Sequence, residues 1–206
     1  MEYRCKVTVI GKKLYPDLQA EYCAVPDSGK CPCYNVGDEF LFYRNDERDD
    51  YWHMGEGTLI KAGKPDDGCL QSPGTAHCGT KGVPFCSEAW DAISRYIYTA
   101  LQGGAIMHGW TKDDRVMIAC CNDGTRPVIF KIERLDYKVL YVTGADSEIA
   151  QDKLKVKLET LPGVHSANIR KDKGFVEVFM DRNHEVPDAL IRGALHGIGV
   201  DAAKIE

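Results

Sequence analysis

The sequence predicts an α+β protein of two domains: an N-terminal mixed β domain with one main helix, residues 1–136, and a C-terminal βαββαβ domain, residues 137–206. Three observations carry this prediction. The chain has 206 residues, which is enough for two small cores. Its hydrophobic and charged contents, 44% and 28%, are ordinary for a folded protein. All nine cysteines lie at or before Cys121, so the second domain contains none.

Charge and hydropathy exclude several classes of function. The formal net charge is −5 and neither predicted domain has an excess of basic residues, so nucleic acid is not an expected partner. The first residues, MEYRCKVTVIGKK, lack the apolar core of a secretory signal. No window approaches the roughly 18 apolar residues that span a bilayer. A cytoplasmic protein without a membrane partner is expected, and its nine cysteines are expected as free thiols, metal ligands or redox thiols.

The first strand of the N-terminal domain is expected at residues 3–10. Strict alternation there places Cys5, Val7 and Val9 on one buried face. Cys23 lies in a second strand-like run, residues 21–25. Both Cys5 and Cys23 are therefore predicted to be small core residues.

Residues 44–83 are predicted to be a long insertion, because a charge run, RNDERDD, is followed by scattered Gly, Pro and Ser. Such a segment inside a compact domain is typical of a functional lid, a bound ion or disorder. Cys69, His77 and Cys78 belong to it. Their side chains suit zinc by type, although their spacing is not that of a usual structural zinc motif.

A helix is predicted from Ser87, a good N-cap, to a stop at Gly103 and Gly104. Its apolar residues recur with helical period: Ala89, Ile93, Tyr96, Ile97 and Ala100. Cys86 stands directly before the helix, where unpaired N–H groups and the helix dipole favour a thiolate. Cys86 is thus a candidate metal ligand or nucleophile, and simple packing of its side chain at the start of the helix is the alternative.

Two further stretches supply candidate sulfur ligands. Cys31 and Cys33 form a C-x-C pair, which on an extended backbone projects both side chains to one side. Cys120 and Cys121 are neighbours on a predicted strand and point to opposite faces, so at most one of them serves a given site. The strands expected after the helix are 115–121 and 127–133.

The C-terminal residues alternate between strand and helix patterns. An acidic or hydroxyl cap at Asp146 or Ser147 precedes the first helix, and Pro187 suits the first position of the second. The expected strands are 138–143, 164–170, 175–180 and 201–205. The order βαββαβ is that of the ferredoxin-like arrangement, with two helices on one face of a four-stranded antiparallel sheet.

The stretch LETLPGV, residues 158–164, the hairpin after it and residues 189–200 resemble the heavy-metal-associated domain of copper chaperones and metal-transporting ATPases. That family carries a C-x-x-C loop after its first strand, since Cu(I) prefers paired sulfur ligands. The corresponding loop here, Gly144–Ser147, contains no sulfur. The resemblance therefore implies a docking or dimerising domain that lacks CxxC, with a protein partner or a second copy of the chain as its expected contact.

Three segments of the N-terminal domain, GKCPCYNVGDEF, PFCSEAWDAISRYIYTALQGG and CNDGTRPVIFKIERL, resemble a family of small uncharacterised cysteine-containing proteins of anaerobic bacteria and archaea. The resemblance covers residues 1–136 apart from the insertion. The thiols that match its pattern are Cys31, Cys86 and Cys121.

Three functions from different classes follow. In the first, Cys31, Cys86 and Cys121, with Cys33 or an insertion residue as a fourth ligand, bind zinc or an iron–sulfur cluster in a redox or metal accessory protein of anaerobic metabolism. In the second, Cys86 is the catalytic thiol of an enzyme, with His77 or His108 as its base. In the third, the protein is a non-catalytic docking or regulatory protein with structural cysteines.

Overall fold

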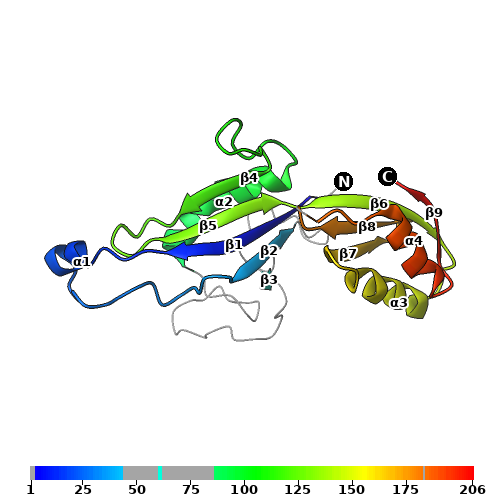
Figure 1. Ribbon diagram of the computed structural model, residues 1–206, viewed down its shortest axis with the longest axis horizontal. Helices are drawn as coiled ribbons and strands as arrows, with labels where there is room; N and C mark the ends of the chain where they lie inside the picture. Colours follow the sequence, from blue (N-terminus) through cyan, green and yellow to red (C-terminus); the bar gives the residue numbers. More distant parts are fainter. Residues whose placement is uncertain (1–2, 44–59, 62–85, 183) are drawn as a thin grey trace. The chain divides into compact units, whose positions relative to one another are not determined.

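The α+β class is confirmed: the chain has separate helices and strands, and its strands form two antiparallel sheets (Figure 1). The structure, a computed structural model, describes residues 3–43, 60–61, 86–182 and 184–206. It divides into two compact units, Met1–Arg134 and Leu135–Glu206. Across the described ranges, no helix combines the length and the apolar character needed to pass through a lipid bilayer.

The N-terminal unit is a five-stranded sheet with the order β3-β2-β1-β5-β4, and α2 (Ser87–Leu101) packs on one face of it. Every pairing within this sheet is antiparallel. Its strands are β1 (Arg4–Lys12), β2 (Glu39–Tyr43), β3 (Ile60–Lys61), β4 (Val116–Cys120) and β5 (Val128–Arg134). β3 is the one described element of the predicted insertion, and it pairs with β2.

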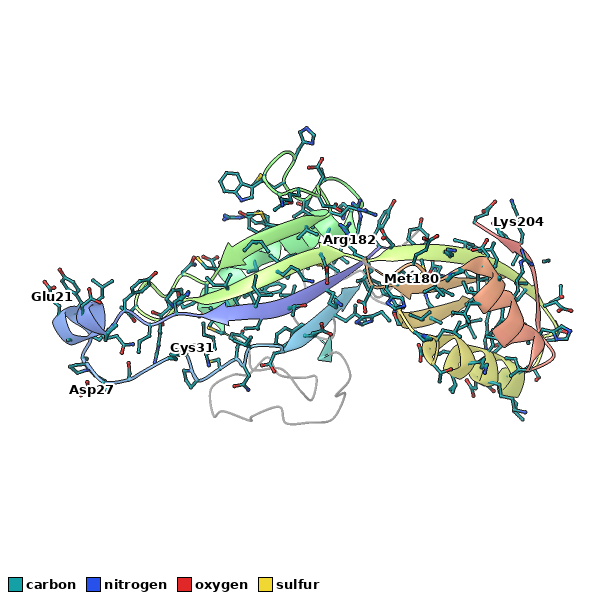
Figure 2. All side chains as sticks on the ribbon, viewed as in Figure 1. Glu21, Asp27, Cys31, Met180, Arg182 and Lys204 are labelled. Atoms are coloured by element: carbon teal, nitrogen blue, oxygen red, sulfur yellow. The ribbon has the colours of Figure 1, made fainter. Side chains whose placement is uncertain are left out.

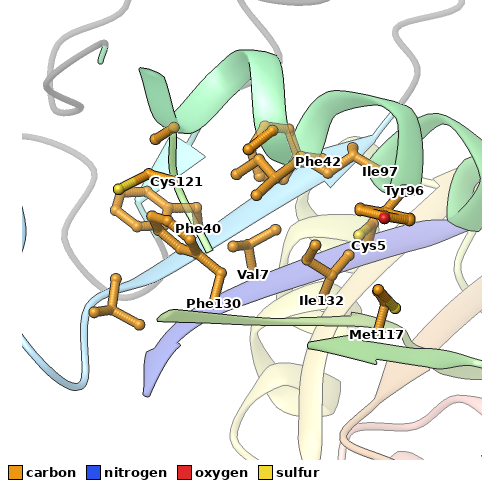
Figure 3. Close-up of a cluster of buried hydrophobic side chains, with 14 of the residues drawn as sticks. Cys5, Val7, Phe40, Phe42, Tyr96, Ile97, Met117, Cys121, Phe130 and Ile132 are labelled. Atoms are coloured by element: carbon orange, nitrogen blue, oxygen red, sulfur yellow. The ribbon is translucent and has the colours of Figure 1, made fainter. Parts of the chain in front are cut away.

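The core of this unit lies between the sheet and α2. Alternation along β1 buries Cys5, Val7 and Val9, as predicted, and all five apolar helix residues named above are buried against them. Figure 3 shows Cys5 and Cys121 among the aromatic and aliphatic side chains of this cluster. The sheet and helix therefore hold cysteines in an apolar layer.

The opposite face of β1 differs from the simple polar face that alternation implies. Lys6 is only 6% exposed, and its Nζ lies 3.4 Å from the Glu133 carboxylate and 3.6 Å from that of Glu39. Lys131 Nζ lies 3.0 Å from the same Glu133 oxygen. These pairings compensate a buried carboxylate on the centre of the sheet.

The prediction for residues 21–25 was wrong. The chain forms α1 (Pro16–Tyr22) there, with Pro16 at the first helical position, where a missing N–H costs nothing. Cys23 is the C-cap of this helix and is half-buried, so it is neither in a strand nor a core residue. A seven-residue helix is too short to show a clear apolar period, which explains the error.

The C-terminal unit has the element order that the sequence predicts. Its elements are β6 (Asp136–Thr143), α3 (Glu148–Glu159), β7 (Val164–Arg170), β8 (Phe175–Met180), α4 (Asp188–His196) and β9 (Asp201–Ile205). The sheet order is β7-β8-β6-β9, with all three pairings antiparallel. Figure 1 shows α3 and α4 beside this sheet.

Local signals account for the ends of these helices. Ser147, one of the two predicted caps, accepts a hydrogen bond from the Ala150 N–H at 3.2 Å. Gly199, with φ of +76°, allows the chain to reverse after α4, and the Val200 N–H then donates to the Leu195 carbonyl at 3.1 Å. Pro187 precedes α4 as its N-cap rather than its first residue.

Candidate functional site

Four cysteines from three separate segments gather at one part of the N-terminal core. Cys31 and Cys33 lie in the loop between α1 and β2, Cys86 precedes α2, and Cys121 follows β4. Cys31 and Cys121 are buried members of the core cluster, and Cys33 and Cys86 are partly buried against it. We call these four side chains the thiol cluster.

The loop that carries Cys31 is tied to α1. Gln19, only 1% exposed, donates from Nε2 to the Gly29 carbonyl at 3.0 Å and accepts from the Gly29 N–H at 3.2 Å. Gly29 has φ of +72°, a backbone conformation that favours glycine. Figure 2 labels Cys31 on this loop. A buried amide thus fixes the backbone two residues before the first thiol of the C-x-C pair.

Cys31 and Cys33 meet on a bend of the chain rather than on the extended backbone that the spacing favoured. Their side chains are hydrogen-bonded to each other. Partial burial, followed by the negative charges of Cys31 and Cys86, raises the pKa of Cys33 to about 11, and the Arg126 guanidinium acts in the opposite direction. The Cys33 thiol is therefore protonated at neutral pH unless a cation replaces its proton.

Cys86, rather than Ser87, is the N-cap of α2, and Ser87 is the first helical residue. The Cys86 backbone has extended dihedral angles, φ −118° and ψ 114°, and its side chain caps no N–H. Its sulfur is consequently left near the first turn of a 15-residue helix, whose positive end favours an anion. The Asn122 N–H donates to the Glu88 carbonyl at 3.1 Å, which holds the segment after Cys121 against this first turn.

Cys121 is placed as a hydrogen-bond acceptor. Its Sγ accepts a hydrogen bond from the Val128 N–H at 3.2 Å. Burial raises the pKa of Cys121, the Val128 and Asp123 N–H groups lower it, and the negative charge of Cys86 raises it again. Cys120, its neighbour, is exposed, so the two thiols do face opposite ways.

Two residues that the sequence did not indicate belong to the site. Tyr34 is buried and its ring lies 5.5 Å from Phe130 and 5.8 Å from Phe40, both edge to face. Burial raises the pKa of its phenol, as do the charges of Cys86, Cys33 and Cys31, while a hydrogen bond from the Cys86 backbone opposes them. Tyr34 follows the C-x-C pair directly, and that adjacency is the signal that could have found it.

Arg126 supplies the positive charge of the site. Its Nε donates to Asp123 Oδ2 at 2.9 Å, and this bond, followed by the carboxylate charge of Asp123 and the charges of Cys31 and Cys33, raises the pKa of the guanidinium. Burial alone would raise the pKa of Asp123, but hydrogen bonds from Thr125 and Arg126 outweigh it and lower the pKa. Arg126 is therefore held charged beside the C-x-C thiols.

The thiol cluster is not drawn together around a single point. Within residues 3–43, 60–61, 86–182 and 184–206, no group of three or more His, Cys, Asp or Glu side chains is placed so that it could hold a metal ion as it stands. A metal would have to bring the sulfurs closer together; Cys33 lies on a bend and is only partly buried. The other candidate ligands, Cys69, His77 and Cys78, lie outside the described residues.

The proposed base His108 is not beside Cys86. Its side chain is 88% exposed, and its Nδ1 lies 2.6 Å from Asp114 Oδ2 in the loop that follows α2. Cys86 lies at the other end of this 15-residue helix, whose length is about 22 Å at 1.5 Å per residue. His77 lies outside the described residues.

Comparison of the chain with models of protein families, with curated proteins and with solved structures finds no match.

Proposed function

We propose that this protein is a metal-binding accessory protein of redox metabolism, whose centre is the thiol cluster Cys31, Cys33, Cys86 and Cys121. The observation that carries the proposal is the convergence of four sulfurs from three segments of the chain, one of them accepting a backbone N–H bond at 3.2 Å. Hydrogen bonds from backbone N–H groups to sulfur are characteristic of the outer shell of thiolate metal centres, where they tune the ligand.

The donor set selects the class of metal. Sulfur ligands without oxygen favour zinc or an iron–sulfur cluster over magnesium or calcium. Burial first, and the charges of Cys31 and Cys86 second, raise the pKa of Cys33, and a bound cation would offset both effects. Arg126 and the positive end of α2 offset the negative charge that remains on a centre with four thiolates.

The chemistry of such a centre follows from its surroundings. Cys31 and Cys121 are buried, so water reaches the centre from the side of Cys33 and Cys86. Zinc held by four thiolates would stabilise the junction of the C-x-C loop, α2 and β4. An iron–sulfur cluster in the same place would exchange electrons, with a potential set by the N–H bonds to sulfur and by Arg126.

For the C-terminal unit we propose the ferredoxin-like fold of heavy-metal-associated domains and a docking function. The sheet order β7-β8-β6-β9 supports the fold, and the loop Gly144–Ser147 has no sulfur that would bind a metal. The expected contact is a protein partner or a second copy of the chain. Light scattering of the purified protein distinguishes the two, because self-association doubles the measured mass.

The test of the metal proposal is the content of the protein itself. Protein purified without oxygen should contain close to one zinc ion or one iron–sulfur cluster per chain, which elemental analysis and the visible absorption spectrum identify. Cys86→Ser should lose the metal. Metal-free protein whose stability is unchanged by Cys86→Ser would disprove the proposal.

The position of Cys86 at the N-cap of a long helix supports a second candidate, a cysteine-dependent enzyme. This candidate predicts that Cys86 reacts with iodoacetamide faster than a thiol of the unfolded chain. A reaction no faster than that would remove the reason for it.

A further inference from the structure

The loop that carries the C-x-C pair, residues 31–33, is tied to the rest of the unit on both sides. Before the loop, the Gln19 amide makes two hydrogen bonds to the backbone of Gly29, at 3.0 Å and 3.2 Å. After the loop, Lys12 Nζ donates to the carbonyl oxygen of Tyr34 at 2.6 Å. These hydrogen bonds restrict the backbone on either side of the two thiols.

The two thiols of this loop are in direct contact. A hydrogen bond joins the side chains of Cys31 and Cys33, and the chain bends at residues 32–33. A bend shortens the distance between residues two apart in the chain, and a disulfide requires Cα atoms within about 7 Å of each other. Cys86 influences Cys33 through its charge, whereas Cys31 does so through its charge and through the direct hydrogen bond. Cys31 is therefore the sulfur best placed to pair with Cys33.

The two sulfurs differ in their access to solvent. Cys31 is 9% exposed and belongs to the core, whereas Cys33 is half-buried at the edge of the core. A small dissolved disulfide reaches Cys33 from the solvent side, and Cys31 lies beside it to complete an exchange. Because the backbone already holds the two thiols together, closing a bond between them costs little conformational entropy.

We propose that Cys31 and Cys33 form a reversible disulfide with each other on exposure to a small oxidised disulfide such as oxidised glutathione, and that this disulfide releases the metal of the thiol cluster. The Cys31 Sγ–Cys33 Sγ bond forms and the S–S bond of oxidised glutathione breaks. The cysteine sulfurs lose two electrons, glutathione gains them, and the two thiol protons end on two glutathione thiols. In the metal-bound protein the cation leaves instead, and the glutathione thiolates take protons from the solvent.

The disulfide itself requires no metal, whereas its regulatory role rests on the proposed metal centre. Cys86 and Cys121 would remain as two sulfur ligands, which is fewer than the four of a structural zinc site. A disulfide that closes so short a loop constrains the unfolded chain little, and strained or exposed disulfides are easily reduced. The centre should therefore lose its metal under oxidising conditions and bind it again after reduction.

The first test maps the disulfides of the full-length protein after equilibration with oxidised glutathione, alkylation and digestion with trypsin. The exchange must reach equilibrium, because the pKa of Cys33, raised to about 11, keeps its thiol protonated and the reaction slow. Residues 31–44 form one tryptic peptide, which contains Cys31 and Cys33 and no other cysteine. This peptide should be lighter by the mass of two hydrogen atoms and carry no alkyl group. Attachment of either thiol to glutathione or to Cys86, or its alkylation, as the main product would overturn the proposal.

The same digest contains a matched control. Residues 116–131 form a peptide whose two cysteines, Cys120 and Cys121, are adjacent in sequence but face opposite ways. These two thiols should form no disulfide with each other, because contact in space rather than closeness in sequence decides the product. An equal yield of the disulfides 31–33 and 120–121 would contradict the argument from geometry.

A pair of neighbouring variants tests the restriction of the loop. Lys12→Met removes the hydrogen bond to the Tyr34 carbonyl, so the ratio of oxidised to reduced glutathione needed for half-formation of the disulfide should rise about fivefold. Lys13→Met changes an exposed lysine next to it and should shift this ratio by less than a factor of about two. Equal ratios for the two variants would overturn the argument that the tied loop favours the disulfide.

A metal measurement separates this inference from the proposed function. Zinc-loaded protein treated with oxidised glutathione should release its zinc to a chromophoric chelator in step with formation of the 31–33 disulfide, and reduction should restore zinc binding. Protein that forms the disulfide and retains its zinc would overturn the regulatory role. Protein that forms the disulfide but contains no metal as purified, and binds none, would disprove the metal centre and support the disulfide alone.

Discussion

Replacement of Cys121 by serine is the perturbation that tests the thiol cluster most directly. Serine keeps the shape of the side chain, and its hydroxyl oxygen can accept the hydrogen bond that the Val128 N–H donates to Cys121 Sγ at 3.2 Å. What is lost is one soft sulfur ligand. Cys120→Ser is the matched control, because the neighbouring thiol is exposed and faces away from the cluster.

The expected size of the effect follows from the number of ligands. Structural zinc sites contribute about 10–16 kcal/mol in total, so each of four thiolates accounts for roughly 2.5–4 kcal/mol. At about 1.4 kcal/mol for each factor of ten, Cys121→Ser should weaken zinc binding roughly 60- to 700-fold. Cys120→Ser should leave the affinity within a factor of about two.

The assay is an oxygen-free competition titration of zinc against a chromophoric chelator, repeated with cobalt. Thiolate-to-cobalt charge-transfer absorption should weaken in Cys121→Ser and stay constant in Cys120→Ser. A urea unfolding curve of each metal-free variant verifies that the fold is intact. Equal zinc affinities for Cys121→Ser and Cys120→Ser would refute the argument that Cys121 is a ligand.

Three further outcomes are expected. Lys6→Met should lower the free energy of unfolding in urea by about 2–3 kcal/mol, because Glu133 stays buried and loses one of its two lysine partners, keeping Lys131. An effect below about 0.5 kcal/mol would contradict the idea that Lys6 compensates the charge of Glu133. The affinity for zinc should rise between pH 6 and pH 8 by roughly tenfold per pH unit for each proton that the metal displaces. The reason is that burial and neighbouring charges raise the pKa of Cys33 to about 11, so that its thiol is protonated throughout this range without metal. A zinc affinity independent of pH would argue against thiolate ligation. Ser147→Ala should lower the free energy of unfolding in urea by about 1 kcal/mol and reduce the helical circular dichroism signal, because α3 loses its N-cap. Ser166→Ala, which removes a hydroxyl from β7, should leave the helical signal unchanged.

The C-terminal unit was predictable in detail because its signals are local. Turn residues bound the hairpin at 164–170 and 175–180, and the observed strands β7 and β8 have these same limits. In α3 the spacing of Leu154 and Leu158 marks the buried stripe, and both side chains are fully buried. Each of these features depends on residues within a few positions of one another.

The helix α2 was predictable for the same reason, whereas α1 was not. The apolar period of α2 extends over 15 residues, and all five of its predicted core positions are buried. In α1 the buried residue is Gln19, a polar side chain that no hydrophobic pattern can reveal. Its role depends on Gly29, which follows ten residues later and supplies both of its hydrogen bonds.

The amino-acid order alone determined the elements of the C-terminal unit, together with β1 and α2, because periodicity, caps and turns act over short distances along the chain. Only the tertiary structure decided that Cys31, Cys33, Cys86 and Cys121 gather beside Tyr34 and Arg126, and that Lys6 is buried against Glu133. These contacts join residues that are dozens of positions apart, and the packing of α2 on the sheet brings them together. Contacts between residues so far apart in the chain leave no repeating pattern in the sequence from which they could be predicted.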